Sequence, residues 1–195
     1  MTTPAHTNDP SVGAVAAAPL IPSSVPNPLR TAADLASVVA AVLVAAIFGF
    51  FYAWVCSTLW GLDAADPRVA IEAMQAMNAS VRNPVFFVSF FLTPVALAVA
   101  ALLSWARNAR IPAVLFGVAA ALYTVGGILL TSTINVPWNE ALAMVTVPAS
   151  VDEAAAIWQE YSGKWQIANL VRTVVSGVCV VLTAIGLLQL GRARR

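Results

Sequence analysis

With 195 residues the chain is long enough for one soluble domain, but its composition excludes that class. Only 10% of the residues are Asp, Glu, Lys or Arg and 60% are hydrophobic, whereas a soluble domain carries about 25% charged residues to cover its surface. The formal net charge of +1 offers no basic excess for nucleic acid, so a nucleic-acid partner is excluded as well.

The N-terminal segment Met1–Pro28 contains half of the twelve prolines, together with many Ala, Ser and Thr residues. Such a mixture cannot bury a hydrophobic core, so residues 1–30 are predicted to be a disordered tail on the cytoplasmic side. The segment does not fit a cleaved signal peptide, because no basic residue precedes its apolar run and Pro19 interrupts that run. The first span is therefore expected to act as an uncleaved signal anchor.

Four apolar segments follow the tail, and each is long enough to cross a bilayer. A hydrocarbon core about 30 Å thick needs roughly 20 apolar residues in a helix. Three of the segments contain no charged residue and the fourth contains only Arg172; their bounds are 35–59, 84–105, 112–134 and 166–190. Residues 31–195 are therefore predicted to form an all-α membrane protein, a four-transmembrane-helix bundle with structured non-cytoplasmic loops.

The basic residues predict the orientation of this bundle. Six arginines flank the spans on one side, whereas the basic residues of the other side are diluted among acidic ones; the six are Arg30, Arg107, Arg110, Arg192, Arg194 and Arg195. Because Lys and Arg near span ends stay in the cytoplasm, we expect both termini there, in a bacterial-type plasma membrane.

Both connections on the opposite side are expected to be structured. Asp66-Pro67 is a helix-start signal in the first, and Ser150 with Glu153 fits a capping box in the second. The cytoplasmic connection is only a tight turn. Binding or chemistry is therefore expected on the non-cytoplasmic face.

Arg172 is the main candidate for a functional residue. A charge inside a transmembrane helix is costly and usually faces the bundle interior or a water-filled cavity. The alternative is that the long side chain extends to the membrane interface. Arg172 shares one helix face with Trp165, Asn169 and Ser176, and this polar stripe favours the interior position.

Other polar and aromatic residues gather near the same membrane face. Thr131, Asn135 and Asn139 follow one another at spacings of four, and Trp138 and Trp165 lie in the connection between spans three and four. The alternatives to a pocket are interhelical hydrogen bonds, worth about 0.6 kcal/mol each, and interfacial anchoring by the Trp rings.

The single histidine, His6, lies in the tail, so imidazole ligation of haem, copper or zinc by the bundle is not expected. The spans contain no Asp or Glu, which disfavours a coupled transporter.

Four short motifs occur in a specific order: Gly49–Tyr52, Met74–Asn78, Asn135–Asn139 and Trp165–Arg172. In this order and spacing they resemble the anthrone oxygenase-like membrane family over about residues 35–190. The resemblance implies a four-helix membrane fold. It also suggests the oxidation of anthrone-type polyketides to anthraquinones by molecular oxygen.

The residues and the resemblance together lead to a hypothesis for the site. Hydrogen-bond donors beside the oxygen of an aromatic ligand would stabilise an enolate or phenolate as it forms. The residues predicted to supply these donors, and hence predicted to be catalytic, are Arg172, Asn135 and Asn169. The predicted substrate-binding residues are Trp138, Asn139, Trp165, Asn78 and Tyr52. A base would remove a benzylic proton, and Glu140, Tyr161 and Glu160 all remain open for that role. No metal or other cofactor is required in this scheme.

A different class of function explains the same residues without catalysis. In that case the protein is a membrane accessory subunit or a lipid-binding module. Arg172 would then pair with a lipid headgroup or with Glu140, and the Asn residues would fasten the loops to the bundle. The expected partners are membrane lipid and, for the oxygenase, a small aromatic substrate and oxygen; any protein partner stays open.

Overall fold

The computed structural model describes Met1 and residues 27–192, and the predicted disordered tail lies almost entirely outside the described residues. The described chain contains helices and no strands, which confirms the all-α prediction. Four continuous helical segments are long and apolar enough to cross a membrane, as predicted. The domain bounds and the sidedness of the termini stay predictions.

The first spanning segment consists of α1 (Pro28–Ala53), the π-helical η1 (Trp54–Thr58) and α2 (Leu59–Asp63). The second is α4 (Pro84–Ala106). The third consists of α5 (Arg110–Tyr123), the π-helical η2 (Thr124–Leu129) and η3 (Thr131–Asn135), and α6 (Val136–Ala143). The fourth is α7 (Val151–Arg192), and the short α3 (Pro67–Ser80) connects the first two.

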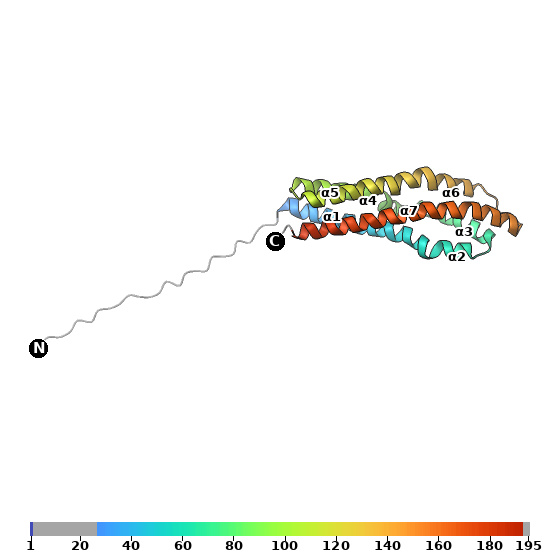
Figure 1. Ribbon diagram of the computed structural model, residues 1–195, viewed down its shortest axis with the longest axis horizontal. Coiled ribbons are helices and arrows are strands. Elements are labelled where there is room, and N and C mark those ends of the chain that lie inside the picture. The colour runs from blue at the N-terminus through green and yellow to red at the C-terminus, as the bar shows by residue number, and fades with distance from the viewer. Residues whose placement is uncertain (2–26, 193–195) are drawn as a thin grey trace.

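The four spanning segments form an antiparallel bundle in which each packs on two neighbours. α1 packs against α4 and α7, and α5 packs against the same two helices. The start of α1 and the end of α7 lie at one end of the elongated bundle, here called the terminal end (Figure 1). The opposite end carries α2, α3, α6 and the start of α7, and is here called the loop end (Figure 1).

The helices at the loop end are longer than the hydrophobic segments predicted. The polar helix expected from residue 151 and the span expected over 166–190 are one helix of 42 residues. The third segment likewise continues through Pro137 to Ala143. Proline lacks the N–H of an α-helical bond, and the turn before it is π-helical, with the Val136 N–H donating to the Thr131 carbonyl. The helix therefore passes the proline instead of ending there.

The short helix α3 begins where the Asp66-Pro67 signal predicts. The Asp66 carboxylate caps it by accepting a hydrogen bond from the Arg68 N–H at 2.9 Å. Hydrogen bonds from the Arg68 side chain and backbone lower the pKa of this carboxyl to about 2. α3 packs against α6 and α7, and so covers the loop end of the bundle.

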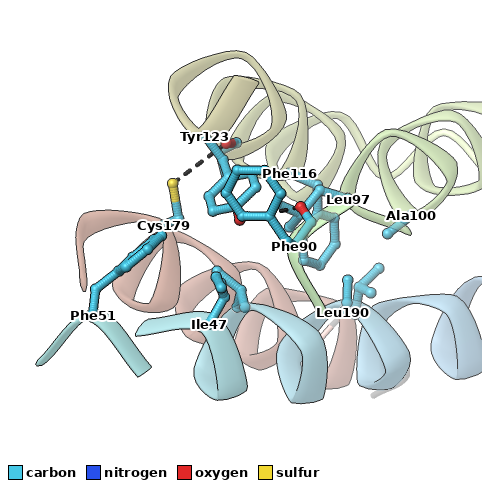
Figure 2. Packing of buried hydrophobic residues seen from close by; sticks show 12 residues of the cluster. Ile47, Phe51, Phe90, Leu97, Ala100, Phe116, Tyr123, Cys179 and Leu190 are labelled. Carbon is cyan, nitrogen blue, oxygen red and sulfur yellow. Dashed lines mark hydrogen bonds between the residues drawn. The ribbon is translucent and has the colours of Figure 1, made fainter. Parts of the chain in front are cut away.

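The core of the bundle contains a proline whose effect is compensated by a neighbouring helix. Pro94 lies inside α4 and leaves the Phe90 carbonyl without its α-helical donor. The buried Tyr123 hydroxyl donates to this carbonyl at 3.1 Å (Figure 2). The Cys179 thiol similarly lies 3.4 Å from the Ala119 carbonyl. These contacts tie α4 to α5 and α5 to α7 inside an otherwise apolar core.

Candidate functional site

Arg172 lies in the interior of the bundle, and its side chain does not extend to the membrane interface. The residue is only 5% exposed. Nη2 donates to Asn169 Oδ1 at 3.0 Å, and Nη1 donates to Thr131 Oγ1 at 3.3 Å. The guanidinium carbon lies 4.7 Å from the Phe51 ring centroid and 5.1 Å from that of Trp165. The cation is therefore held by neutral groups on three spanning segments.

The guanidinium has no carboxylate partner among residues 27–192. The ion pairs of this part of the chain do not include Arg172. Glu140, the carboxylate that was considered for it, instead lies 3.5 Å from Arg82 Nη2. Arg172 Nε is buried and has no hydrogen-bond partner in the described chain. Since an uncompensated buried charge costs several kcal/mol, the arrangement favours an anion or a strong acceptor beside it.

Asn135 is a second buried polar group without a partner. It is 1% exposed, and neither its amide nitrogen nor its amide oxygen makes a hydrogen bond in the described chain. It ends η3, which begins at Thr131, the residue that bonds Arg172. An unpaired buried amide costs roughly 1–3 kcal/mol. A ligand or water that bonds this amide would recover that cost.

Asn169, in contrast, uses both ends of its amide within the protein. Nδ2 donates to the Phe51 carbonyl at 3.1 Å, and Oδ1 accepts from Arg172. Phe51 lies just before η1, where the α-helical hydrogen-bond pattern of the first segment changes. Asn169 therefore joins α7 to α1 and orients the guanidinium, which makes it a positioning residue in this geometry.

Asn139 holds the loop end together. Its Oδ1 accepts hydrogen bonds from the Tyr161 hydroxyl at 2.8 Å and from Trp165 Nε1 at 2.9 Å. Asn78 Nδ2 in turn donates to the Tyr161 hydroxyl at 3.3 Å. This network connects α3, α6 and α7 around the indole of Trp165, which faces Arg172.

A cavity of about 250 Å³ lies between the bundle and α3, here called the head cavity. Four of the predicted site residues line it: Arg172, Trp165, Asn139 and Asn78. Thr131 and Glu140 line it as well, so its polar groups come from α3, η3, α6 and α7. Arg82 and Glu140 lie at its exposed rim.

The other four predicted site residues do not line this cavity: Asn135, Asn169, Trp138 and Tyr52. Asn169 lines a separate cavity of about 270 Å³ between η1, α2 and α7. Trp138 packs in the loop-end core, with the Lys164 ammonium 5.6 Å from its ring centroid. Tyr52 is 50% exposed and stacks on Phe48 at 5.7 Å. Substrate-binding roles for Trp138 and Tyr52 stay predictions without a contact to the cavity.

The apolar wall of the head cavity was missed in the sequence. The start of α4 contributes Phe86, Phe87, Phe90 and Phe91, and the first segment contributes Phe50 and Trp54. The two Phe pairs are spaced by four residues on one helix, which is the signal that could have found them. In the described chain, α4 contacts the third spanning segment through α5 and η2 but not through η3 or α6. The phenylalanines line the head cavity, which η3 and α6 line as well.

Two of the π-helical segments contribute to this wall. η1 begins at Trp54 and η3 begins at Thr131, and both residues line the head cavity. π-helical turns are rare and occur frequently at functional sites, because the extra residue redirects side chains.

The sequence profile of the anthrone oxygenase family matches residues 84–182, just over half of the chain. The match spans α4 to most of α7 and includes Asn135, Asn139, Trp165, Asn169 and Arg172. It leaves out α1 and α3, and with them Asn78 and the part of the predicted resemblance before residue 84. No curated protein and no solved structure matches the chain.

Proposed function

The chain belongs to the anthrone oxygenase family, and we propose that it binds a phenolic aromatic molecule in the head cavity and oxidises it with molecular oxygen. The observation that carries this proposal is the buried Arg172, which has an unpaired Nε and no carboxylate partner among the described residues. The cavity beside it is lined mainly by aromatic rings. A planar ligand with an anionic oxygen complements both features.

Arg172 would act on the ligand's oxygen. A fixed cation in a water-poor site stabilises a developing enolate more strongly than water does, because its charge needs no reorganisation. Asn135 does not line the cavity, so its catalytic role stays a prediction. Asn169 holds the guanidinium in place through its 3.0 Å hydrogen bond. Trp165 would stack on the ligand's ring system.

Glu140 is the best placed of the three candidate bases. It lines the head cavity, whereas Tyr161 and Glu160 do not. Tyr161 donates its proton to Asn139, and Glu160 is engaged by Lys164 at 3.4 Å on an exposed face of α7. A base must reach the proton it removes directly or through one water, and Glu140 alone of these three meets that condition from the cavity wall.

The proposed reaction balances without an added cofactor. Glu140 accepts the proton from the benzylic carbon of an anthrone, and the electron pair passes to the oxygen that faces Arg172. Molecular oxygen then forms a bond to that carbon, and the resulting peroxide anion takes the proton back from Glu140 to give a hydroperoxide. Loss of water from the hydroperoxide leaves a second carbonyl. The substrate loses two hydrogen atoms and gains one oxygen atom, and the second oxygen atom leaves as water.

The test is oxygen consumption with anthrone by the purified chain in lipid nanodiscs. We expect anthraquinone formation above the rate with empty nanodiscs, and a rate lowered at least tenfold in Glu140→Gln. Because the Glu140 side chain is 60% exposed, this replacement should change the thermal stability little. The matched control is Glu160→Gln, which changes an exposed carboxylate outside the head cavity. A wild-type rate equal to that of empty nanodiscs, or full activity in Glu140→Gln, contradicts the proposal.

A further inference from the structure

The head cavity continues into a second hollow on the surface of the bundle, here called the side groove. This groove of about 700 Å³ lies between α1, the end of α3 and the start of α4. It shares five lining residues with the head cavity: Phe50, Trp54, Met77, Val81 and Phe86. The Phe50 and Phe86 rings lie 5.0 Å apart and form the boundary between the two spaces. At this distance the two rings are in contact, and they separate the groove from the cavity.

The side groove offers a ligand almost only apolar contacts. Its polar side chains are bonded to nearby backbone carbonyls of their own segment. Ser80 Oγ donates to Met77 at 3.1 Å, Asn83 Nδ2 to Ser80 at 2.7 Å, and Ser89 Oγ to Phe86 at 3.0 Å. The head cavity, by contrast, holds the unpaired Arg172 Nε. The two connected spaces are therefore polar at one end and apolar at the other.

The apolar end faces the hydrocarbon of the bilayer. Val85, at the rim of the groove, is 84% exposed. Ala46 lies at its deep end, on the exposed side of α1. Ala46 is about 18 Å along the helix from Asp34 and about 21 Å from Trp60, at a rise of about 1.5 Å per residue. This position is close to the middle of the membrane, so the groove runs from the loop end into the lipid core.

We propose that the natural ligand is a phenol that carries a long apolar tail. The phenolic head occupies the head cavity beside Arg172, and the tail lies in the side groove, which requires the Phe50 and Phe86 rings to rotate apart. The ligand reaches the site from the bilayer and not from water. The position of the head rests on the proposed function; the position of the tail rests on the continuity of the two spaces and on the apolar lining of the groove.

The experiment compares two probes that differ only in the tail, naphthol and dodecyl-naphthol, by calorimetric titration of the chain in nanodiscs of constant lipid composition. Ala46→Trp fills the side groove at a residue that does not line the head cavity. The matched control is Ala32→Trp, which fills a separate lipid-facing groove of about 420 Å³ between α1 and α4 at the terminal end. Both alanines are exposed, so the variants should fold. Partitioning of a probe into lipid cancels when two proteins in the same bilayer are compared.

We expect Ala46→Trp to weaken dodecyl-naphthol binding by about tenfold or more and to change naphthol binding by less than about twofold. Ala32→Trp should change neither. Equal effects of Ala46→Trp on both probes, or no effect on either, overturn the tail position. A third probe, dodecyl phosphate, tests whether the ligand carries a lipid-like phosphate head and not a phenol. If it binds as tightly as dodecyl-naphthol, the proposal of a phenolic head is overturned. The proposed function fails separately if the wild-type chain does not bind naphthol, or if Arg172→Gln binds naphthol as tightly as the wild type does.

Discussion

Replacing Arg172 by glutamine should separate ligand binding from stability. The change removes two ring contacts of the cation, at 4.7 Å and 5.1 Å, which are worth about 1–2 kcal/mol each when desolvated. It also weakens the charge-assisted hydrogen bonds to Thr131 and Asn169, worth about 1.5–3 kcal/mol. Against these losses, the variant avoids burying a charge in a membrane helix, which costs about 2.5–3.5 kcal/mol. The losses exceed this gain, so the free energy of unfolding should fall by about 1–4 kcal/mol.

The effect on the ligand is measured separately from the stability, as a rate of oxidation. Glutamine has no positive charge and offers only a neutral amide donor, so an anionic oxygen in the head cavity loses its main partner. Removing one such donor costs about 2.7–4 kcal/mol, which corresponds to a decrease of about 100-fold to 1,000-fold in the rate of anthrone oxidation. Thermal unfolding and oxygen uptake, measured on the same nanodisc preparation, give the two quantities.

The control for this prediction is Arg110→Gln, which removes one positive charge at the terminal end, where Arg110 lies over the Trp105 ring at 3.8 Å. Its anthrone oxidation should equal that of the wild type. A strongly destabilised Arg172→Gln protein that still oxidises anthrone at the wild-type rate would refute the reasoning, because Arg172 would then be a packing residue only.

Two further predictions concern packing and the loop end. Gly126→Ala should destabilise the bundle by about 1–3 kcal/mol in thermal unfolding, because the new Cβ would lie 2.8 Å from Val175 Cγ2. The control Gly49→Ala should be neutral, because nothing lies within 4 Å of its new Cβ. Equal unfolding midpoints for the two variants would contradict this. Asp63→Ala should lower the free energy of unfolding by about 1–3 kcal/mol, because Asp63 accepts hydrogen bonds from the α7 side chains of Trp158, Ser162 and Gln166. The control Glu160→Ala should lower it by less than about 1 kcal/mol. A neutral Asp63→Ala would show that these hydrogen bonds do not hold the loop end.

The four spans and several helix starts could be predicted because the signals are local. The length of an uncharged apolar run determines whether a segment spans the bilayer, whatever its neighbours are. The Asp66 cap of α3 likewise involves only adjacent residues. The interior position of Arg172 followed from the polar stripe on its own helix, which also holds Trp165 and Asn169.

The tertiary structure decided which of these residues meet. The cavity wall joins Phe50 of α1 to Phe86 of α4, and the hydrogen bond from Asn169 to the Phe51 carbonyl joins residues far apart in the chain. Such contacts depend on the rotation and relative height of packed helices, which a hydrophobic profile does not contain. The same is true of the amide of Asn135: its residue type was visible in the sequence, but its burial without a partner in the described chain is a property of the packed bundle.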